Sequence, residues 1–437
     1  MKNAKQNRTH QTPKDENSFS LQSSHFLIPR LRFPEFREAE GWKPVTLREA
    51  STPVNERVGQ RKLTPVSISA GIGFVPQAEK FGRDISGKQY HLYTLVRDGD
   101  FVFNKGNSLK FPQGCVYLLQ GWGEVAAPNV FICFRLKDRY SNGFFQNCFE
   151  QNQHGKQLMR DITSGARSNG LLNISKDTFF DVEIPTPSLP EQQKIASCLS
   201  SVDELIAAQA RKLDALQTHK KGLMQQLFPR EGETQPRLRF PEFRDAGEWG
   251  SDSLGNLFET SSGGTPNRAN AEYWNGTIPW ITTSLVSSNI ITEADAFITD
   301  AGLGDSSAKL FPEQTILLAM YGQGKTRGQV AMLGIEAATN QACAAILPRK
   351  DIDPRFVFLN LASRYEELRG LSNSGGQENL SQGLIRGLQF PYPKDQAEQQ
   401  RIADCLTTLD DLIAAQTQKL EVLKTHKKAL MQQLFPG

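Results

Sequence analysis

The sequence predicts an α+β protein in which two globular domains alternate with two long helices that pack together as an antiparallel intramolecular coiled coil. Three observations predict this fold: an internal duplication, a heptad pattern in each shared segment, and turn-rich strand patterns between the shared segments. The chain of 437 residues is long enough for two to four domains. Two like helices in one chain would give the molecule an internal pseudo-twofold axis.

The duplication has a constant shift of 207 residues. PRLRFPEFR at Pro29–Arg37 recurs at Pro236–Arg244, and about 27 of the 39 positions in Glu191–Pro229 are identical in Glu398–Pro436. Trp42 recurs as Trp249 with the same shift. The chain therefore contains two copies of a shared scaffold.

The segments between the shared copies, 54–187 and 260–393, have similar lengths but align at only a few scattered positions. We therefore expect two unlike domains on two like scaffolds. The predicted boundaries are a polar tail at 1–28, expected to be disordered, a first globular domain at 29–187, a first helix at 188–235, a second globular domain at 236–393 and a second helix at 394–437.

Each shared helix carries apolar residues spaced alternately by four and three, which is the seam of a coiled coil. Eight of ten seam positions are apolar in each copy: Ile195, Leu199, Val202, Ile206, Leu213, Leu216, Leu223 and Leu227, then Ile402, Leu406, Leu409, Ile413, Leu420, Leu423, Leu430 and Leu434. About 38 residues at roughly 1.5 Å each give a rod of about 57 Å.

The remaining seam positions are polar in both copies. Gln209 and Gln416 are expected to set the register, and Lys220 and Lys427 are expected to extend their ammonium groups to solvent. The nearest surface that can cover each stripe is the other helix, which favours antiparallel pairing within one chain. The alternative is that each helix pairs with a second chain in a homodimer.

Strand patterns dominate both variable segments, with helices expected at 143–163 and 354–371. Their Gly, Asn, Ser and Gln residues place short polar side chains on tight turns, where they can reach base edges. Residues 54–187 carry about 16 basic and 12 acidic residues, and residues 260–393 about 10 and 12. The whole chain has a net charge of +3, so it is not a strongly basic protein that coats nucleic acid alone.

The segment GQGKT at Gly322–Thr326 is similar to the end of a phosphate-binding P-loop. The first glycine of that motif would fall at Ala319, and strand-like residues follow in place of a helix, so a nucleotide site is not expected. We interpret the segment as a hairpin tip suited to phosphate or guanine contacts, or as a solvated turn.

Other conspicuous residues have structural explanations. His219 and His426 are expected on solvated helix surfaces, while Glu191 and Glu398 lie in a first helical turn, where favouring the helix dipole is sufficient reason for a carboxylate. Phe33 and Phe36, with their counterparts Phe240 and Phe243, are expected to dock on the scaffold or a partner. Six cysteines without a C-x-x-C pair predict neither disulfides nor a metal site, and the absence of long apolar runs predicts a cytoplasmic protein that does not enter membranes.

Several motifs together resemble the specificity (S) subunit of bacterial type I restriction-modification enzymes. They are PSLPEQQKIASCLSSVDELI, the LMQQLFP ending, SSGGTPNRANAEYWNGTIPWI, KLFPEQTILLAMYGQGKTRGQVAMLG, ATNQACAAI, ERVGQRKLTPVSISAGIGFV and FNKGNSLKFPQG. The resemblance covers nearly all of Pro29–Gly437. The tail before it has no counterpart in the second copy.

The resemblance implies that each variable segment is a target recognition domain for one half of a split, asymmetric sequence in double-stranded DNA. It implies that the helices space the two halves and bind two modification subunits, which methylate adenine, and that restriction subunits join to cleave DNA. S-adenosylmethionine, ATP and magnesium are then expected on the partner subunits and none on this chain. Two recognition domains about one helical turn of DNA apart, near 34 Å, suit the length of the rod.

The candidate DNA-binding residues lie in the polar turns of these motifs. They are Arg61, Lys62, Asn104, Lys105, Asn107, Ser108, Lys110, Gln113, Thr265, Arg268, Tyr321, Gln323, Lys325, Thr326, Arg327, Asn340 and Gln341. The chain has no [DN]-P-P-[YF] adenine-methylation motif, and QFPYP at Gln389–Pro393 is only superficially similar to it. We therefore expect a non-catalytic subunit. The alternative is a structural adaptor with a coiled-coil scaffold and two protein-binding domains.

Overall fold

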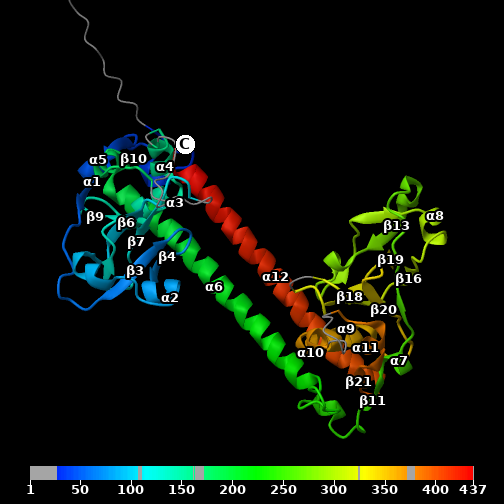
Figure 1. Ribbon diagram of the computed structural model, residues 1–437. Helices are drawn as coiled ribbons and strands as arrows, with labels where there is room; N and C mark the ends of the chain where they lie inside the picture. The colour runs from blue at the N-terminus through cyan, green and yellow to red at the C-terminus, as the bar shows by residue number, and fades with distance from the viewer. Residues whose placement is uncertain are drawn as a thin grey trace, which may run out of the picture. The chain divides into compact units, whose positions relative to one another are not determined.

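The computed structural model describes residues 27–106, 111–160, 162, 172–322, 325–371 and 379–436. The chain divides into two compact units (Figure 1). The first unit comprises Met1–Ile206 and Val422–Gly437, and the second unit comprises Ala207–Glu421. Each unit therefore contains one globular domain, one end of the first long helix and the opposite end of the second.

The globular domain of the first unit is built from short strands and helices. In order these are η1 Pro34–Phe36, β1 Lys43–Thr46, α1 Leu47–Ala50, β2 Ser51–Pro53, β3 Thr64–Ser69, β4 Gly73–Pro76, α2 Gln77–Phe81, η2 Gly87–Leu92, β5 Thr94–Arg97, β6 Asp100–Asn104, β7 Cys115–Leu118, β8 Glu124–Ala127, β9 Ile132–Leu136, α3 Asn142–Glu150, α4 Gln153–Leu158, α5 Lys176–Phe180 and β10 Glu183–Thr186. The long helix α6 follows at Leu189–Leu227.

The second globular domain is built in the same style. In order its elements are η3 Pro241–Phe243, β11 Gly250–Ser253, α7 Leu254–Leu257, β12 Thr260–Ser262, η4 Ala271–Tyr273, β13 Trp274–Ile281, η5 Thr283–Leu285, β14 Ile290–Ile291, β15 Ala296–Ile298, α8 Asp300–Gly304, β16 Leu310–Phe311, β17 Ile316–Ala319, β18 Val330–Leu333, β19 Ala337–Thr339, β20 Cys343–Ile346, α9 Pro354–Ser363, α10 Tyr365–Gly370, α11 Gln382–Gly387 and β21 Gln389–Tyr392. The long helix α12 follows at Gln396–Leu434.

The two domains share one sheet topology although their sequences do not align. The first has sheets β2-β9-β6-β7 and β4-β3-β8-β5, and the second has β12-β20-β17-β18-β14 and β15-β13-β19-β16. Each domain closes with an antiparallel pair, β1 with β10 and β11 with β21, and each has one parallel crossover pair at the same place, β3 with β8 and β13 with β19. The strands therefore correspond one to one, with β14 as an addition in the second domain.

The cores of the two domains are filled by different kinds of side chain. The first is aromatic: the ring of Phe103 stacks on Phe179 at 4.4 Å between centroids, and Phe101 stacks on Phe134 at 5.3 Å. In the second, the central strands β17 and β20 have the sequences ILLA and CAAI and are buried at every position. The strands at the centre of the two domains therefore carry different side chains, although the second core also contains aromatic rings such as Phe356 and Phe390.

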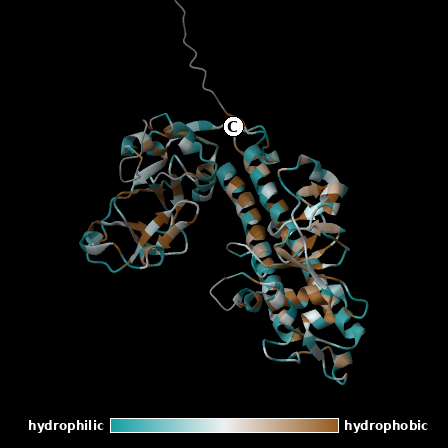
Figure 2. Ribbon diagram, turned by 45° about the vertical axis from the view of Figure 1, so that its right-hand side comes forward, coloured by the Kyte–Doolittle hydropathy of each residue, from teal (hydrophilic) through white to brown (hydrophobic). Residues whose placement is uncertain are grey.

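The long helices α6 and α12 carry a hydrophobic stripe along an otherwise hydrophilic surface (Figure 2). The seam residues predicted from the sequence are buried or half-buried. Those at the helix ends belong to the domain cores: Ile195, Leu199 and Leu434 pack into the first, while Leu227 and Ile402 pack into the second. The ends of the helices are therefore integral parts of the globular domains.

Side-chain contacts within each unit show that α6 and α12 are antiparallel. In the second unit, Gln209 Nε2 donates to the Oε1 atom of Gln416 at 2.9 Å, and Lys220 Nζ lies 2.5 Å from Asp410 Oδ1. In the first unit, Lys427 Nζ lies 2.8 Å from Asp203 Oδ1. Residue numbers rise on one helix as they fall on the other, which confirms the predicted intramolecular pairing and antiparallel direction.

The two seam lysines differ from the sequence-based prediction. Their ammonium groups were expected to reach solvent, but the side chains of Lys220 and Lys427 are only 20% and 17% exposed and end on carboxylates. Lys220 forms an ion pair with Asp410, and Lys427 forms ion pairs with both Asp203 and Glu150. The aliphatic stems fill the seam as expected, and ion pairs at its edge replace solvation.

A buried charged contact joins the start of each long helix to the scaffold segment that precedes the domain. The carboxylate of Glu191 accepts two hydrogen bonds of 2.7 Å from Arg32 and a third of 3.3 Å from Trp42 Nε1. The hydrogen bond to Glu191 raises the pKa of Arg32. The Arg32 and Glu191 side chains are only 6% and 1% exposed.

The same contact occurs at the start of α12. Glu398 accepts from Arg239 at 2.8 and 2.6 Å and from Trp249 Nε1 at 3.2 Å. The prediction that the helix dipole is sufficient reason for these two carboxylates is therefore wrong. They are buried acceptors that fasten each helix to its own domain.

The glutamine that follows each of these carboxylates makes a second repeated contact. Gln192 accepts from Ser141 N at 2.9 Å and donates to Pro187 O at 2.9 Å. Gln399 accepts from Asp353 N at 2.7 Å and donates to Pro393 O at 2.8 Å. Ser141 and Asp353 are the N-caps of α3 and α9. The EQQ motif therefore fixes the start of α3 or α9 relative to the long helix of the same unit.

The repeated PRLRFPEFR segment lies against the ends of both long helices. Leu31 N donates to Gln433 O at the end of α12, and Leu238 N donates to Gln226 O at the end of α6, both at 2.9 Å. Phe33 packs on the first core and Phe240 on the second. The docking expected for these two phenylalanines is confirmed, and the scaffold is the surface that receives them.

We predict that Glu191→Gln destabilises the first unit by about 3–5 kcal/mol, because the variant leaves the Arg32 guanidinium buried without its counter-charge. Urea unfolding of the full chain followed by circular dichroism measures the loss. The matched control is Glu35→Gln, because Glu35 pairs with Lys194 at 3.0 Å but both side chains are about half exposed. That variant should destabilise the chain far less than Glu191→Gln, because solvent screens the exposed pair. Equal losses in the two variants would contradict the role of the buried pair.

A second prediction concerns His154 in the first core. It is 1% exposed, its ring lies 5.5 Å from that of Phe149, and neither ring nitrogen has a hydrogen-bond partner. Burial lowers the pKa of His154 from 6.5 to about 4. The unfolded chain therefore binds this proton below pH 6.5 while the folded chain resists it down to about pH 4. Stability present above pH 6.5 is lost as the pH falls through this window, by about 3 kcal/mol in total.

The change that tests this is His154→Leu, which fills a similar volume without a titratable group. Melting temperatures of both proteins between pH 7.5 and 4.5 should show the wild type losing stability relative to the variant as the pH falls, since only the wild type loses this contribution. A constant difference between the two proteins across the range would show that His154 does not titrate as described.

Candidate nucleic-acid interface

One end of the five-stranded sheet in the second unit gathers most of the candidate residues of that domain. The loop after β12, the loop after β17 and the turn before β20 all lie at this end, because β20 is antiparallel to both β12 and β17. Gly264 N donates to Thr339 O at 2.8 Å, and Met320 N donates to Ala342 O at 2.9 Å. These bonds join the three loops into one surface, which we call the acceptor-facing loop cluster: residues 263–268, 320–322 and 339–342.

Two glycines allow this close packing. A Cβ atom on Gly263 would collide with the Thr339 carbonyl, and one on Gly264 would collide with Ser307. The backbone of the GGTPNR segment therefore lies directly on its neighbours, which only glycine permits at such a distance. The segment holds a fixed conformation at the surface.

Arg268 lies at the end of this segment on two tryptophans. Its guanidinium carbon is 5.2 Å from the Trp274 ring and 5.5 Å from the Trp280 ring, and the two rings meet edge to face at 5.1 Å. The indole N–H groups are anchored in turn, Trp274 to Asn267 O at 3.2 Å and Trp280 to Gly264 O at 3.0 Å. The exposed guanidinium is thus held in place by cation–π contacts. The two tryptophans are not among the candidate residues predicted from the sequence.

Three polar residues of the same loops make hydrogen bonds within the cluster. Thr265 Oγ1 donates to Gln341 Oε1 at 2.6 Å, and Asn340 Oδ1 accepts from Ala342 N at 3.1 Å. Gln341 is exposed and Asn340 half-buried. The structure therefore brings Thr265, Arg268, Asn340 and Gln341 together, with exposed Tyr321 on the neighbouring loop.

The GQGKT segment lies between β17 and β18, as expected for a hairpin connection. Strand β18 follows it, whereas a P-loop requires a helix there. Lys325 is exposed and its carbonyl accepts from Tyr365 Oη at 2.9 Å, while Arg327 Nη2 donates to Arg369 O at 3.1 Å. Thr326 is half-buried, and Gln323 lies outside the described residues. The connection therefore rests on α10, with the Arg327 side chain turned toward that helix.

In the first unit, the corresponding connection runs from β6 to β7. Asn104 Nδ2 donates to Ile68 O at 2.8 Å and its Oδ1 accepts from Gly106 N at 2.7 Å, so both ends of this amide are used within the domain. Gln113 Oε1 accepts from Asn152 at 3.3 Å, and Lys105 Nζ lies 3.5 Å from Ile174 O. These residues hold the connection on its own domain. The candidates Asn107, Ser108 and Lys110 lie outside the described residues.

Arg61 and Lys62 lie away from this connection, on the loop that leads into β3. Arg61 pairs with Glu56 at 3.1 Å, and Arg97 pairs with Glu56 at 2.7 Å and with Glu124 at 2.9 Å. The hydrogen bond from Arg97 lowers the pKa of Glu56. Arg61 is therefore partly neutralised by neighbouring carboxylates, while Lys62 is exposed beside it. The structure does not join these two residues to Asn104, Lys105 and Gln113.

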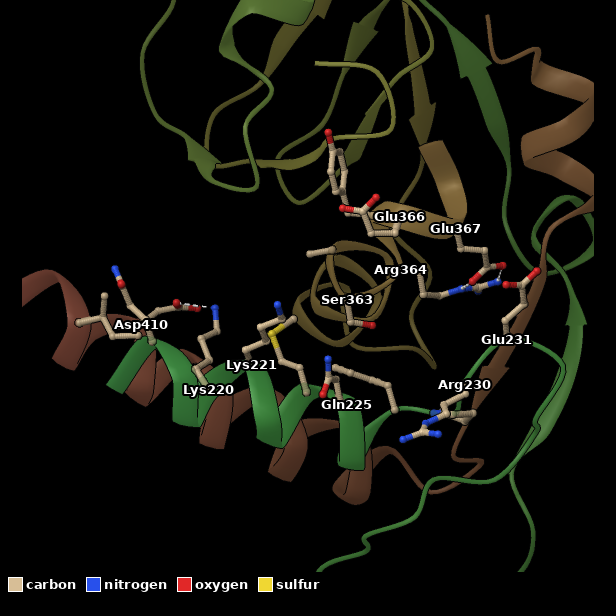
Figure 3. Close-up of a pocket in the computed structure, with 17 residues that line it drawn as sticks. Lys220, Lys221, Gln225, Arg230, Glu231, Ser363, Arg364, Glu366, Glu367 and Asp410 are labelled. Atoms are coloured by element: carbon tan, nitrogen blue, oxygen red, sulfur yellow. Dashed lines mark hydrogen bonds and ion pairs between the residues drawn. The ribbon is translucent and has the colours of Figure 1, made fainter. Parts of the chain in front are cut away.

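A groove of about 930 Å³ lies in the second unit between the end of α6 and the helices α9 and α10 (Figure 3). Two ion pairs lie in its wall: Lys220 with Asp410, and Arg364 with Glu367 at 2.5 Å. Met224, Phe228 and Ile413 supply apolar surface. The lining residues include no histidine or cysteine, and the arrangement contains no nucleophile paired with a base.

Metal-binding clusters and membrane-spanning helices are both absent from the part of the chain that the structure describes. Within it, no three His, Cys, Asp or Glu side chains gather closely enough to hold a metal ion. None of its helices combines the length and the apolar character needed to cross a membrane.

The sequence matches the family model of the type I restriction modification DNA specificity domain twice, at residues 89–218 and 246–425. Curated relatives include the type I restriction enzyme MjaIX specificity subunit of Methanocaldococcus jannaschii, 28% identical over 40% of this chain and 41% of the relative. The EcoR124I/EcoR124II specificity subunit of Escherichia coli is 26% identical over 56% of this chain and 60% of the relative. The matched region thus spans about two fifths to three fifths of these two relatives.

Solved structures show the same fold. One chain, solved in work on complex assembly and conformational transition of the type I R-M system, has a TM-score of 0.56 at 17% identity and covers 94% of this chain and 100% of its own. The crystal structure of the S subunit from M. genitalium has a TM-score of 0.56 at 16% identity and covers 94% of this chain and 99% of its own. With two matches of the family model that together cover more than half of its length, the chain belongs to the type I restriction-modification DNA specificity family.

Proposed function

We propose that this chain is the subunit that recognises DNA in a type I restriction-modification complex, with each globular domain binding one half of a bipartite, asymmetric target. The long helices bind the modification subunits, and restriction subunits join through the same assembly. The chain itself catalyses no reaction. Adenine methylation with S-adenosylmethionine, and cleavage with ATP and magnesium, take place on the partner subunits.

The observation that carries this proposal is one topology used twice with different side chains. Both domains have corresponding sheets, and both are fastened to their helices by an Arg–Glu–Trp contact and an EQQ glutamine at positions 207 residues apart. The attachments are therefore alike while the exposed loops are unlike. Unlike loops on like frames favour two different half-sites over a palindrome.

Charge supports specific recognition over general attraction to phosphate. The net charge is +3, and the second domain has more acidic than basic residues between 260 and 393. Phosphate contacts alone would give weak, salt-sensitive binding with so few cations. Hydrogen bonds from ordered loops to base edges are the mode of recognition that remains.

We predict that the full chain, purified with its modification subunits, protects one bipartite sequence in a footprint. Replacing residues 54–187 by the corresponding segment of another family member should change one half of that sequence and leave the other half unchanged. Methylome sequencing of cells with and without the gene checks the result in vivo. Unchanged adenine methylation would contradict the proposal and favour a structural adaptor.

We further predict that the long helices determine the gap between the half-sites. Insertion of one heptad after Gln209 together with one after Gln416 keeps the seam in phase and lengthens each helix by about 10 Å. The gap should then grow by about three base pairs, at roughly 3.4 Å each, with both half-sites unchanged.

The matched control inserts four residues at the same two places, which shifts the heptad register and should reduce binding to every target. Selection of bound duplexes from a library with variable gaps measures both variants. If the heptad variant selects the original gap, the helices do not determine the spacing.

A further inference from the structure

We propose that the acceptor-facing loop cluster of the second domain recognises a guanine through Arg268 and Gln341, which offer it hydrogen-bond donors. This inference rests on the proposed function and identifies the base that one half-site must contain. It follows from the contacts of four side chains, which are Thr265, Arg268, Asn340 and Gln341.

The first step is that Arg268 is positioned before DNA binds. Two tryptophan rings within 5.5 Å hold its guanidinium, and both rings are anchored through their N–H groups. No carboxylate of the described residues pairs with Arg268, although it is exposed. A guanidinium has five N–H donors and no acceptor, and its planar fork matches the O6 and N7 acceptors of guanine.

The second step concerns the amide of Gln341. A free glutamine side chain offers both a donor and an acceptor, which is the pattern that pairs with adenine N7 and N6. Here Oε1 accepts a hydrogen bond from the Thr265 hydroxyl at 2.6 Å, which occupies one of its two lone pairs, while the NH₂ group keeps both N–H donors for a ligand. The Thr265–Gln341 bond therefore favours this amide as a donor over its role as an acceptor.

The third step is that the neighbouring amide is in the same state. Asn340 Oδ1 accepts from Ala342 N at 3.1 Å, which leaves its NH₂ group as the free end. Three side chains of the same loop cluster, Arg268, Asn340 and Gln341, thus present donors. Among the four bases only guanine offers two acceptors side by side in the major groove, and adenine would place its N6 donor against these donors.

Phosphate oxygens are also acceptors, so the test must separate guanine from the DNA backbone. We would use the full chain with its modification subunits and duplexes in which 7-deazaguanine replaces each guanine of the target in turn. This base lacks only the N7 acceptor. We expect one replacement, in the half-site assigned to the second domain, to weaken binding about 5- to 150-fold, the equivalent of about 1–3 kcal/mol.

Arg268→Ala should weaken binding to the natural target by a similar factor, and 7-deazaguanine at the sensitive position should then have no further effect. The matched control is Arg349→Ala, since Arg349 is an exposed arginine beyond the opposite end of β20. That variant should remain fully sensitive to 7-deazaguanine. Thr265→Val should free the Gln341 carbonyl and raise the tolerance for adenine at or beside the same position.

Two results would overturn this inference while the proposed function stands. One is a half-site for the second domain with no guanine on either strand. The other is that no 7-deazaguanine replacement there matters while Arg268→Ala weakens specific and non-specific duplexes equally, which would make Arg268 a phosphate contact. Binding without any sequence preference would instead contradict the proposed function itself.

Discussion

The architecture depends on a buried carboxylate at the start of each long helix. Glu191 and Glu398 each receive an arginine and a tryptophan from the scaffold segment that precedes the domain. A buried charge is costly unless its hydrogen bonds are satisfied, so these contacts tolerate little displacement. Together with the neighbouring glutamines, they fix the angle at which a globular domain leaves its helix, and this angle does not depend on what the domain contains.

That independence explains how the two domains can differ so widely. One core is packed with phenylalanine rings and the other with alanine, leucine and isoleucine, yet their strands pair in the same order. The contacts of Glu191, Glu398 and the neighbouring glutamines lie outside both sheets, so substitutions in the strands and in the loops leave these contacts in place. The loops at the end of a sheet can therefore change the binding surface while the contacts between the domain and its long helix stay the same.

Much of the architecture was predictable because the chain repeats it. A constant shift of 207 residues and a leucine stripe predicted two domains, two helices and their antiparallel pairing. The buried Arg32–Glu191 and Arg239–Glu398 pairs were missed, since a glutamate in a first helical turn already has a sufficient local explanation. The sequence did contain a sign of these pairs. An arginine, a tryptophan and a glutamate recur with the same shift in both copies, which is consistent with one contact made by all three in each domain.

The candidate site was less predictable, and the reason is geometric. Thr265 and Arg268 are far in sequence from Asn340 and Gln341, and only the pairing of β12, β17 and β20 brings their loops to one sheet end. Sequence patterns also cannot show which end of an amide is occupied. Asn104 is a candidate for base contacts by sequence, but its amide nitrogen and its amide oxygen both make hydrogen bonds within the domain. The hydrogen bond that Gln341 makes with Thr265 uses only the glutamine amide oxygen, so the NH₂ group of Gln341 remains for a ligand.

These hydrogen bonds have a consequence for recognition by a domain with few cations. With little general attraction to phosphate, affinity must come from contacts that lose little entropy when DNA binds. A guanidinium held on two rings and amides held by a hydroxyl and a backbone N–H are already ordered. Under the proposed recognition of guanine, specificity and affinity have the same source, because a wrong base leaves the ordered donors unpaired. A more basic surface would bind more tightly but would discriminate less between sequences.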